Sequence, residues 1–320
     1  MTFYLKRLGH AAFLLAGVSV LSFLLLQLAP GDFFDEMRLN PQISPQTISH
    51  LRSQFGMDKS LPVRYWRWLR SAAHGDFGYS FAYNAPVSPL LRTRALNTVL
   101  LAGVSTLVAW IIALAIGVWN ATRAGRWPDR LSAGVFSFSL AVPDVLVALL
   151  ALLIAVRSGL FPVGGLVSSR FEEFSFLQKA RDIAWHMVLP VSVLAFGLVP
   201  TLARHVRSAV MGALSAPFVR AARAHGISPA RLLFRHVLPA AANPLISLFG
   251  VSLATLLSMS LLVEVIMSWP GLGPFFLEAI MARDVYVVIG VVLLSTSFLV
   301  IGTLLADALL LAADPRIRKS

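Results

Sequence analysis

Long apolar runs alternate with short polar segments along the whole chain. Six runs are long enough to cross a membrane, because about 20 helical residues span about 30 Å of hydrocarbon. They cover residues 9–28, 97–119, 131–156, 183–203, 245–263 and 285–311. The runs are continuous and do not alternate with period two, which predicts helices and argues against a transmembrane β-barrel. The pattern therefore predicts an all-α membrane protein with six transmembrane helices.

Two of these runs carry features that bear on the span assignment. Pro190 and Pro200 interrupt the fourth run, and membrane helices keep such prolines where neighbouring groups satisfy the freed carbonyls. The first run follows a short basic start, as a signal peptide does. It is longer than the usual apolar region of about 7–15 residues and ends without a small-x-small cleavage site. We therefore expect it to be retained as a span.

Composition supports a membrane protein and excludes several other classes. Hydrophobic residues make up 57% of the 320 residues and charged residues only 13%, with a mean hydropathy of +0.77. A soluble domain carries about 25% charged residues, so a disordered chain or an ordinary soluble enzyme does not fit. The chain has no cysteine, which removes disulfides, thiolate nucleophiles and thiolate metal ligands.

The positions of the cations explain the net charge of +12 and predict the orientation. With the N-terminus inside, 14 Lys and Arg residues fall on the cytoplasmic side, with only two acids, Asp129 and Asp314. The short outer loops hold five cations, and a long outer segment holds eight more, but long loops escape the positive-inside rule. We therefore predict that both termini are cytoplasmic, and the charge needs no nucleic-acid partner.

The predicted spans divide the chain into four parts. These are a cytoplasmic N-terminus at 1–8, the first transmembrane helix at 9–28, a long outer (periplasmic) segment at 29–96, and a core of five transmembrane helices at 97–320. The long segment predicts short helices over 47–55 and 63–73. The second is aromatic and basic, which is typical of a helix at the outer membrane surface or of a docking face.

The inner loop at 204–239 has the most informative local pattern. Ser215 with Pro217 after it predicts a helix start, and the helix over 218–225 is expected to end at Gly226 in left-handed conformation. Ser228 and Pro229 predict the start of a second helix.

This second helix is expected over 231–237, with Pro239 stopping it. Two short helices would then meet at a glycine hinge. Together these helices carry four arginines and no acid. Three interpretations compete: a helix-turn-helix DNA reader, a basic loop that only satisfies the positive-inside rule, and a docking platform for a cytoplasmic partner. Helix-in-groove docking suits the small residues Ala221, Ala222 and Ala224.

The loop resembles the "EAA" loop of ABC-importer permeases. Ala221-Ala222, Gly226 and Leu238-Pro239 follow its spacing. Arg220 stands in place of the family's glutamate, a departure that resembles the dipeptide/oligopeptide/nickel branch, and His236 stands where many members have isoleucine. Further segments that resemble this branch are 56–65, 75–81, 97–98, 268–273, 282–284 and 313–318. The resemblance covers nearly the whole chain.

The resemblance implies a type I permease fold in a bacterial inner membrane and a set of partners. These are a second permease that makes a heterodimer, two cytoplasmic ATPase subunits that bind ATP and Mg²⁺, and a periplasmic or lipid-anchored binding protein. The coupling loop to the ATPase would carry Phe218, Arg220, Ala221, Ala222, Gly226, Leu238 and Pro239. The implied substrate is a short peptide, with a nickel chelate or an oligosaccharide as alternatives.

The chain lacks motifs for chemistry of its own. No Gly-x-x-x-x-Gly-Lys-Ser/Thr phosphate-binding loop and no His-Glu-x-x-His zinc motif occur in the sequence. We therefore expect no catalytic residue, no metal site and no cofactor in this chain, and a transport subunit instead of an enzyme. The alternative is an ion-coupled secondary transporter, but its usual internal repeat is missing.

A few polar residues in or beside the spans remain as further candidates. Asp144 follows Pro143 in the third run and is either a helix cap or a polar lining of the transport path. Glu264 at the top of the fifth run is a second candidate for the path. An intramembrane aspartyl protease would need a Gly-x-Gly-Asp context, which Asp144 and Asp307 lack.

The turn after the fifth run is a candidate outer lid. It consists of Trp269, which suits a membrane interface, followed by Pro270 and Gly271.

The predicted orientation can be tested on the natural cysteine-free background. We expect Ala73→Cys to react with an impermeant maleimide added outside sealed cells, because residue 73 lies in the outer segment. Ala224→Cys should react only after the inner face is opened. Labelling of Ala224→Cys from outside would contradict the orientation.

Overall fold

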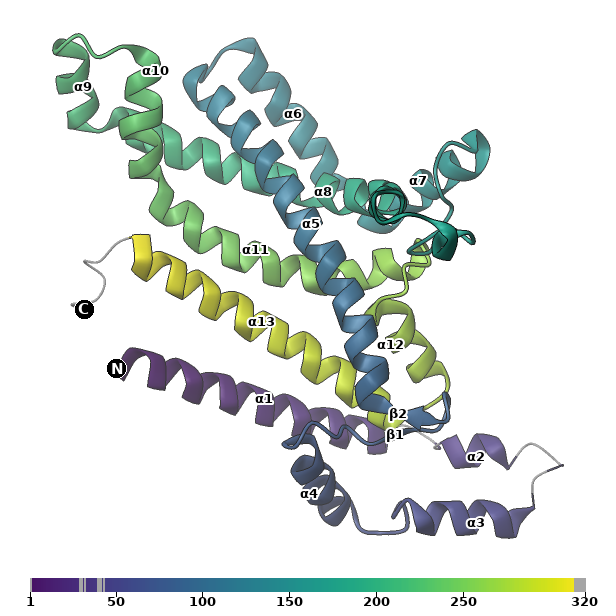
Figure 1. Ribbon diagram of the computed structural model, residues 1–320. Coiled ribbons are helices and arrows are strands. Elements are labelled where there is room, and N and C mark those ends of the chain that lie inside the picture. The colour runs from purple at the N-terminus through teal and green to yellow at the C-terminus, as the bar shows by residue number, and fades with distance from the viewer. Residues whose placement is uncertain (1, 29–30, 32, 39–41, 43, 314–320) are drawn as a thin grey trace. The chain divides into compact units, whose positions relative to one another are not determined.

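The computed structural model describes residues 2–28, 31, 33–38, 42 and 44–313 (Figure 1). The described chain is helical, apart from one hairpin of two-residue strands, β1 (Tyr79–Ser80) and β2 (Ala85–Pro86). This confirms the predicted all-α class. The cations of the predicted cytoplasmic C-terminus, Arg316, Arg318 and Lys319, lie outside the described residues.

Among the described residues, five helices are long and apolar enough to cross a membrane. They are α1 (Thr2–Leu28), α5 (Val87–Thr122), α8 (Phe176–Ser215), α11 (Leu238–Ile266) and α13 (Val285–Ala313). A sixth span is possible as the bent pair α6 (Trp127–Ala141) and α7 (Asp144–Ser158). These elements match the six predicted apolar runs in order.

The chain packs into two compact units. The first comprises Met1–Thr98 and Pro270–Phe298, and the second comprises Val99–Trp269 and Leu299–Ser320. Helices α5 and α13 therefore each contribute residues to both units.

The first unit contains the short helices α2 (Phe33–Met37), α3 (Pro45–Gln54), α4 (Leu61–Ala72) and α12 (Leu272–Met281). Helix α3 starts at Ser44, whose hydroxyl accepts a hydrogen bond from Thr47 N at 3.1 Å, and this confirms the helix expected before Gly56. Helix α12 was not predicted, because its ten residues are too few for a span and carry no distinctive cap.

Helix α4 corrects the interpretation of the aromatic, basic segment 63–73. Trp68 is buried in a cluster with Phe23 of α1 and Ile289 of α13, and Trp68 Nε1 donates to the Phe77 carbonyl at 3.1 Å. The Tyr65 hydroxyl shares a hydrogen bond with Ser19 at 2.8 Å. Most of the aromatic face therefore packs within the chain, and Trp66, which is 68% exposed, is left for lipid or a partner.

The hairpin of the first unit is held by a buried carboxylate. Asp284 is fully buried and accepts hydrogen bonds from Ser80 Oγ at 2.7 Å and from Ala82 N at 3.1 Å. Next to it, the Tyr83 hydroxyl donates to Glu278. Burial, together with the Glu278 carboxylate, raises the pKa of Tyr83 to about 12, so the phenol keeps its proton and this bond persists at neutral pH.

The second unit is organised around α8, which packs against α6, α7 and α11. Pro190 and Pro200 lie inside this helix without ending it. A proline removes the hydrogen bond to the carbonyl four residues earlier, so Pro200 frees the carbonyl of Phe196. Ser139 Oγ of α6 donates to that carbonyl at 3.1 Å. A neighbouring helix thus supplies the missing donor, as the membrane environment requires.

The third predicted span is not one helix. It breaks between α6 and α7, whose axes differ by 94°. Val142 has extended backbone angles, φ −88° and ψ 122°, because a following proline disfavours the helical conformation. Pro143 itself has no N–H to continue the helix. The run 131–156 was predicted as one span, and the structure divides it into two helices at Pro143.

Helices α11 and α13 cross closely at Gly250 of the second unit. A Cβ atom on Gly250 would overlap Ala306 Cβ and would lie 2.8 Å from the Gly302 carbonyl oxygen. Small residues at such crossings let membrane helices approach and gain packing contacts.

We expect Gly250→Val to destabilise the second unit by about 1–3 kcal/mol, because the added methyl groups have no space at the crossing. The measurement is the unfolding midpoint of the purified protein in detergent. Gly212→Val is the matched control, because it adds the same side chain to a helix where nothing lies within 4 Å of the Cβ position. Equal midpoints for the two variants would show that this crossing does not limit stability.

Candidate functional site

The predicted inner loop forms a helical hairpin at one end of α8 and α11 (Figure 1). Helix α9 (Pro217–Ala224) is followed by α10 (Pro229–Leu232) and by one π-helical turn, Leu233–Val237. Ser215 does not cap α9 as predicted. It is the last residue of α8, its hydroxyl donates to the Gly212 carbonyl at 2.8 Å, and Ala216 occupies the cap position.

Gly226 makes the turn between α9 and α10. Its φ is +74°, which confirms the predicted left-handed conformation. Ile227 N donates to Ala222 O at 3.2 Å and Gly226 N donates to Arg223 O at 3.0 Å. These two bonds form a Schellman motif, the usual way to end a helix at glycine. No atom lies within 4 Å of the position of a Cβ at Gly226, so glycine is favoured there by backbone conformation and not by lack of space.

The second short helix does not stop at Pro239. The chain passes through the π turn directly into α11, and Pro239 lies in the first turn of that helix. Leu238 N donates five residues back, to the Leu233 carbonyl. The wider π turn changes which carbonyls accept hydrogen bonds just before Pro239, which has no N–H to donate. The helix therefore continues at a position where, in a regular α-helix, the proline ring would clash with the carbonyl four residues earlier. The expected stop at Pro239 was therefore wrong.

The loop has a buried side and an exposed side. Val219, Leu232 and Val237 are buried and anchor it to the rest of the second unit. Phe218, Arg220 and Ala221 are exposed, whereas Ala222 is only partly exposed, on the side of Val219. The small face that we expected from the alanines is therefore formed by Ala221 and Ala224, and Ala222 belongs to the packing beneath it.

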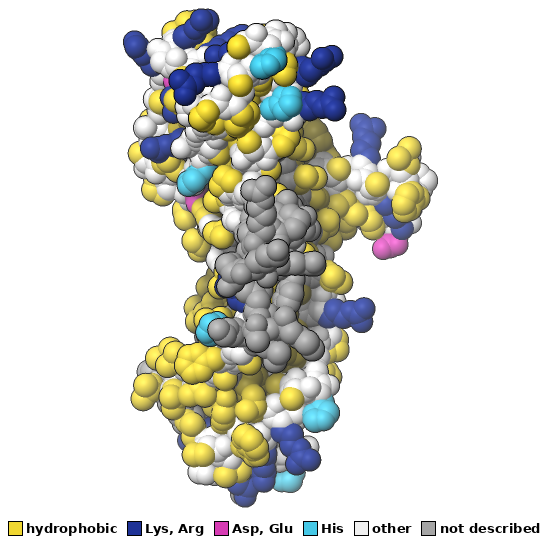
Figure 2. Space-filling view, turned by 90° about the vertical axis from the view of Figure 1, so that its left-hand side faces the viewer, with side chains coloured by type: hydrophobic (Ala, Val, Ile, Leu, Met, Phe, Trp, Pro, Cys, Tyr) yellow, Lys and Arg dark blue, Asp and Glu magenta, His cyan; other side chains and the backbone are white. Residues whose placement is uncertain are grey.

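One exposed aromatic residue of this loop was missed from the sequence. Phe234 is 68% exposed and Phe218 is 39% exposed. Figure 2 shows Lys and Arg side chains gathered around the end of the view at which α9 and α10 lie, with hydrophobic side chains between them. In the sequence, an aromatic residue flanked by arginines was the signal that could have identified Phe234 as part of the exposed face. The exposed face suits a partner groove with an apolar floor and an acidic rim.

Arg207 of α8 forms an ion pair that the sequence did not predict. Its Nε and Nη2 atoms donate to the two Asp129 oxygens at 2.6 and 2.8 Å. Gly125 N donates to the same carboxylate at 2.8 Å. The bidentate geometry fixes the turn between α5 and α6 against α8, on the same predicted inner side as α9.

Asp144 is the first residue of α7, directly after the helix break at Pro143. Both interpretations of Asp144, as a cap at this break and as a polar lining of the path, remain predictions. Its side chain faces a cavity of about 420 Å³ between α6, α7, α8 and α11. A Cβ atom on Gly197 of α8 would lie only 2.7 Å from Asp144 Oδ1. The missing side chain at Gly197 leaves room for the carboxylate, and lining of the path remains our prediction for Asp144.

Glu264 is fully buried in the single chain, where Ser260 Oγ donates to Glu264 Oε1 at 3.2 Å. It is held inside the second unit, and its place in the transport path remains a prediction. Trp269 is also fully buried, although we expected a ring at a membrane interface. Ser268, with φ +50°, turns the chain directly after α11. This places the ring in the interior.

Pro270 and Gly271 directly precede the first unit's helix α12, and Gly271 is its N-cap residue. The Pro270 carbonyl accepts from Asn97 Nδ2 at 2.8 Å, and Leu272 N donates to Thr98 Oγ1 at 2.8 Å. The Asn97-Thr98 pair therefore holds the start of α12, which gives that part of the family resemblance a structural reason. The lid role of this turn remains a prediction.

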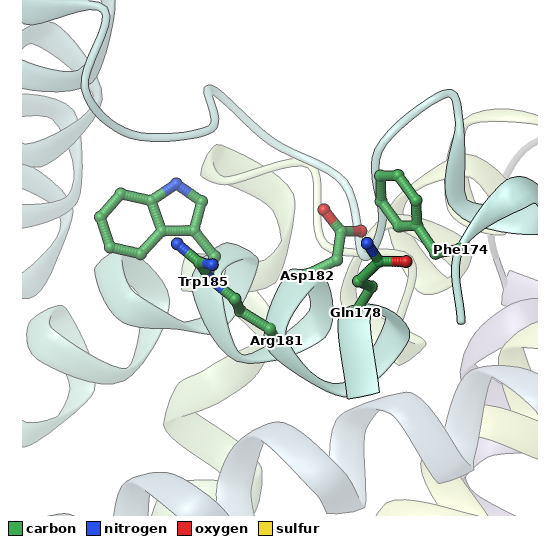
Figure 3. Close-up of a pocket in the computed structure, with 5 residues that line it drawn as sticks. All are labelled: Phe174, Gln178, Arg181, Asp182 and Trp185. Carbon is green, nitrogen blue, oxygen red and sulfur yellow. The ribbon is translucent and has the colours of Figure 1, made fainter. Parts of the chain in front are cut away.

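A second cavity, of about 330 Å³, lies at the start of α8 (Figure 3). Gln178, Arg181, Asp182 and Trp185 lie along the helix, and Phe174 faces them from the preceding loop. Both Asp182 oxygens accept hydrogen bonds from Ser168, one of them from its backbone N at 2.8 Å. This carboxylate already has partners that hold the loop, so the cavity is a weaker candidate than the one at Asp144.

Comparisons with known proteins agree over the full length. Residues 113–319 match the family described as binding-protein-dependent transport system inner membrane component, and residues 1–102 match its N-terminal family. The chain is 34% identical over 306 residues to the oligopeptide transport system permease protein AppB of Bacillus subtilis, covering 95% of each chain. It is 32% identical over 321 residues to the glutathione transport system permease protein GsiC of Salmonella typhimurium, covering 99% of each.

Solved structures confirm the fold. A chain of the inward-facing MetNI methionine ABC transporter matches with a TM-score of 0.56 and 21% identity, over 70% of this chain and 96% of that chain. An amino acid ABC transporter matches with a TM-score of 0.51 and 17% identity, over 71% and 94%. At these identities the likeness supports the architecture of a type I importer permease, and nothing about the substrate.

Proposed function

Because the chain belongs to the family of binding-protein-dependent transport system inner membrane components, we propose that it forms the transport path of an ATP-driven importer together with a second permease. The two family models together cover residues 1–102 and 113–319. This membership sets aside the ion-coupled secondary transporter. A DNA reader is also disfavoured, because α10 has only four residues, too few for a recognition helix.

The α9–α10 loop is the observation that carries the coupling role. It lies outside the predicted spans, Val219 and Leu232 are buried, and α9 and the π turn pack against α8, with the π turn also in contact with α11. Its exposed Phe218 and Ala221 are presented at an angle that the turn at Gly226 sets. We propose that α9 docks in a groove of an ATPase subunit, so that movement of the ATPase pulls on α8 and α11.

ATP and Mg²⁺ are then bound by the partner ATPases, since this sequence has no phosphate-binding loop. The relatives are named for oligopeptide and glutathione transport, and we propose short peptides as the substrate here. A periplasmic or lipid-anchored binding protein would deliver them to a heterodimeric permease in a bacterial inner membrane. Delivery by a separate protein explains why the permease sequence says little about selectivity.

Reconstitution tests this function directly. We expect the purified chain alone to hydrolyse no ATP, and proteoliposomes with the second permease, both ATPases and the binding protein to take up a labelled short peptide when ATP is supplied. Omission of any one partner should abolish uptake. ATP turnover by this chain alone, or uptake driven only by an ion gradient, would contradict the proposal.

Gly226→Val tests the hinge. A β-branched residue at φ +74° is strained by about 1–3 kcal/mol, so the angle between α9 and α10 should change while insertion survives. We expect the variant to reach the membrane at normal levels. Its uptake should fall at least about tenfold, which corresponds to about 1.4 kcal/mol, and the binding protein should no longer stimulate ATP hydrolysis.

Gly159→Val is the matched control for this variant. Gly159 also ends a helix with positive φ, at +62°, and has open space at its Cβ position, but it lies at the end of α7, on the predicted outer side. It should carry the same backbone strain and keep its transport rate. Parental uptake by Gly226→Val would show that this turn does not set the coupling geometry.

A further inference from the structure

The cavity beside Asp144 has a chemical preference that its lining defines. We infer that Asp144 binds a positively charged nitrogen of the cargo, such as the amino terminus of a peptide, on its way through the permease. The inference rests on the proposed function for the identity of the cargo. The cation preference itself rests only on the residues of the second unit.

The bend between α6 and α7 creates the site. Pro143 ends the hydrogen-bonded ladder of α6, and α7 restarts at Asp144 after a turn of 94°. The carboxylate is thereby presented from a break inside an apolar span and not from a loop. Broken helices that carry polar groups near the middle of the bilayer are how transporters build substrate sites without exposing polar backbone to lipid.

The carboxylate has no partner of its own. Within the described residues Asp144 makes no hydrogen bond and no ion pair. Gly197 leaves the space beside Oδ1 open, since a side chain there would begin 2.7 Å from that oxygen. A charged group inside a membrane span is costly unless a partner or water compensates it. Among the described residues that line the cavity, none is Lys, Arg or His, so the chain supplies no counter-charge.

The hydroxyl groups of the cavity make it rich in acceptors. Ser139 donates to the Phe196 carbonyl at 3.1 Å and Thr255 to the Val251 carbonyl at 2.9 Å. Each hydroxyl has one hydrogen to give, so these two present only lone pairs to the space they line. Ser252 donates to the Phe249 carbonyl at 2.7 Å and already accepts from Trp110 Nε1 at 2.8 Å. An ammonium group, which has three donors and no acceptor, fits such a lining, and a carboxylate does not.

The size of the cavity also suits a small ligand. Its volume of about 420 Å³ falls in the range of about 300–1,000 Å³ typical of small-molecule sites. Leu198, Leu248 and Met259 supply apolar walls around the polar group. The site therefore combines one charge, several acceptors and an apolar surface.

A purely structural role for Asp144 makes a different prediction. An acid in the first turn of a helix favours the positive end of the helix dipole. If that were its whole role, removal of the charge would weaken α7 but would leave the charge preference of the cavity unchanged. The two roles are therefore distinguished by measuring the preference of the cavity for cations over anions, in addition to transport activity.

Thr255→Cys provides the probe, because the natural chain has no cysteine. The complete importer complex, purified in detergent, is labelled with a cationic and with an anionic methanethiosulfonate of similar size, and the ratio of the two rates is measured. We expect Asp144→Asn to lower the cation-to-anion ratio about 3–10-fold, as loss of a nearby charge in a partly polar site should. Asp144→Glu should keep the ratio. Ala133→Cys, outside this cavity, should show no change with Asp144→Asn.

Protection by cargo completes the test. A short peptide with a free amino terminus should slow labelling of Thr255→Cys, and its N-acetylated form should not. An unchanged ratio with Asp144→Asn overturns the inference. If Asp144→Asn fails to assemble, equal protection by the two peptides in the complex that keeps Asp144 overturns the inference.

Labelling requires no transport. A complex with the expected cation-to-anion labelling ratio but no peptide uptake would therefore contradict the proposed function alone.

Discussion

Inside a membrane every backbone carbonyl needs a donor from the protein, and the second unit is arranged around the places where proline removes one. At Pro200 the freed Phe196 carbonyl is satisfied by Ser139 of the neighbouring helix at 3.1 Å, so α8 continues. Before Pro239 a π turn changes the register, so the α9–α10 loop runs directly into α11. At Pro143 the helix ends and restarts at 94°.

These three solutions have different functional consequences. In the proposed function, the unbroken α8 and the continuous path into α11 would transmit a displacement at α9 along these helices. The break at Pro143 instead leaves a carboxylate facing a cavity in the same unit. Ser139 contributes to both α8 and the cavity, because its hydroxyl donates to the Phe196 carbonyl of α8 and also lines that cavity. One hydroxyl group therefore contributes both to the continuity of α8 and to the lining of the cavity.

Small residues set the spacing between these elements. Gly250 lets α11 meet α13, and Gly197 leaves space for Asp144. In a bilayer there is little hydrophobic gain from bringing two apolar helices together, so close packing at such glycines supplies much of the stabilisation. Gly226 acts by another mechanism. Its surroundings are open, and only its backbone conformation is special.

The apolar runs, the cation distribution and the glycine and proline positions of the 204–239 loop are local properties. The sequence by itself therefore determined the helical class, the order of the spans, the αL turn at Gly226 and the family. What each proline does depends on whether another helix offers a donor, and that depends on packing. Only the tertiary structure decided that Pro143 breaks a span while Pro190 and Pro200 do not. It also decided that Trp68 and Trp269 are buried and that Ala222 is only partly exposed. A residue's burial is set by neighbours that are distant in sequence, and composition does not record which neighbours those are.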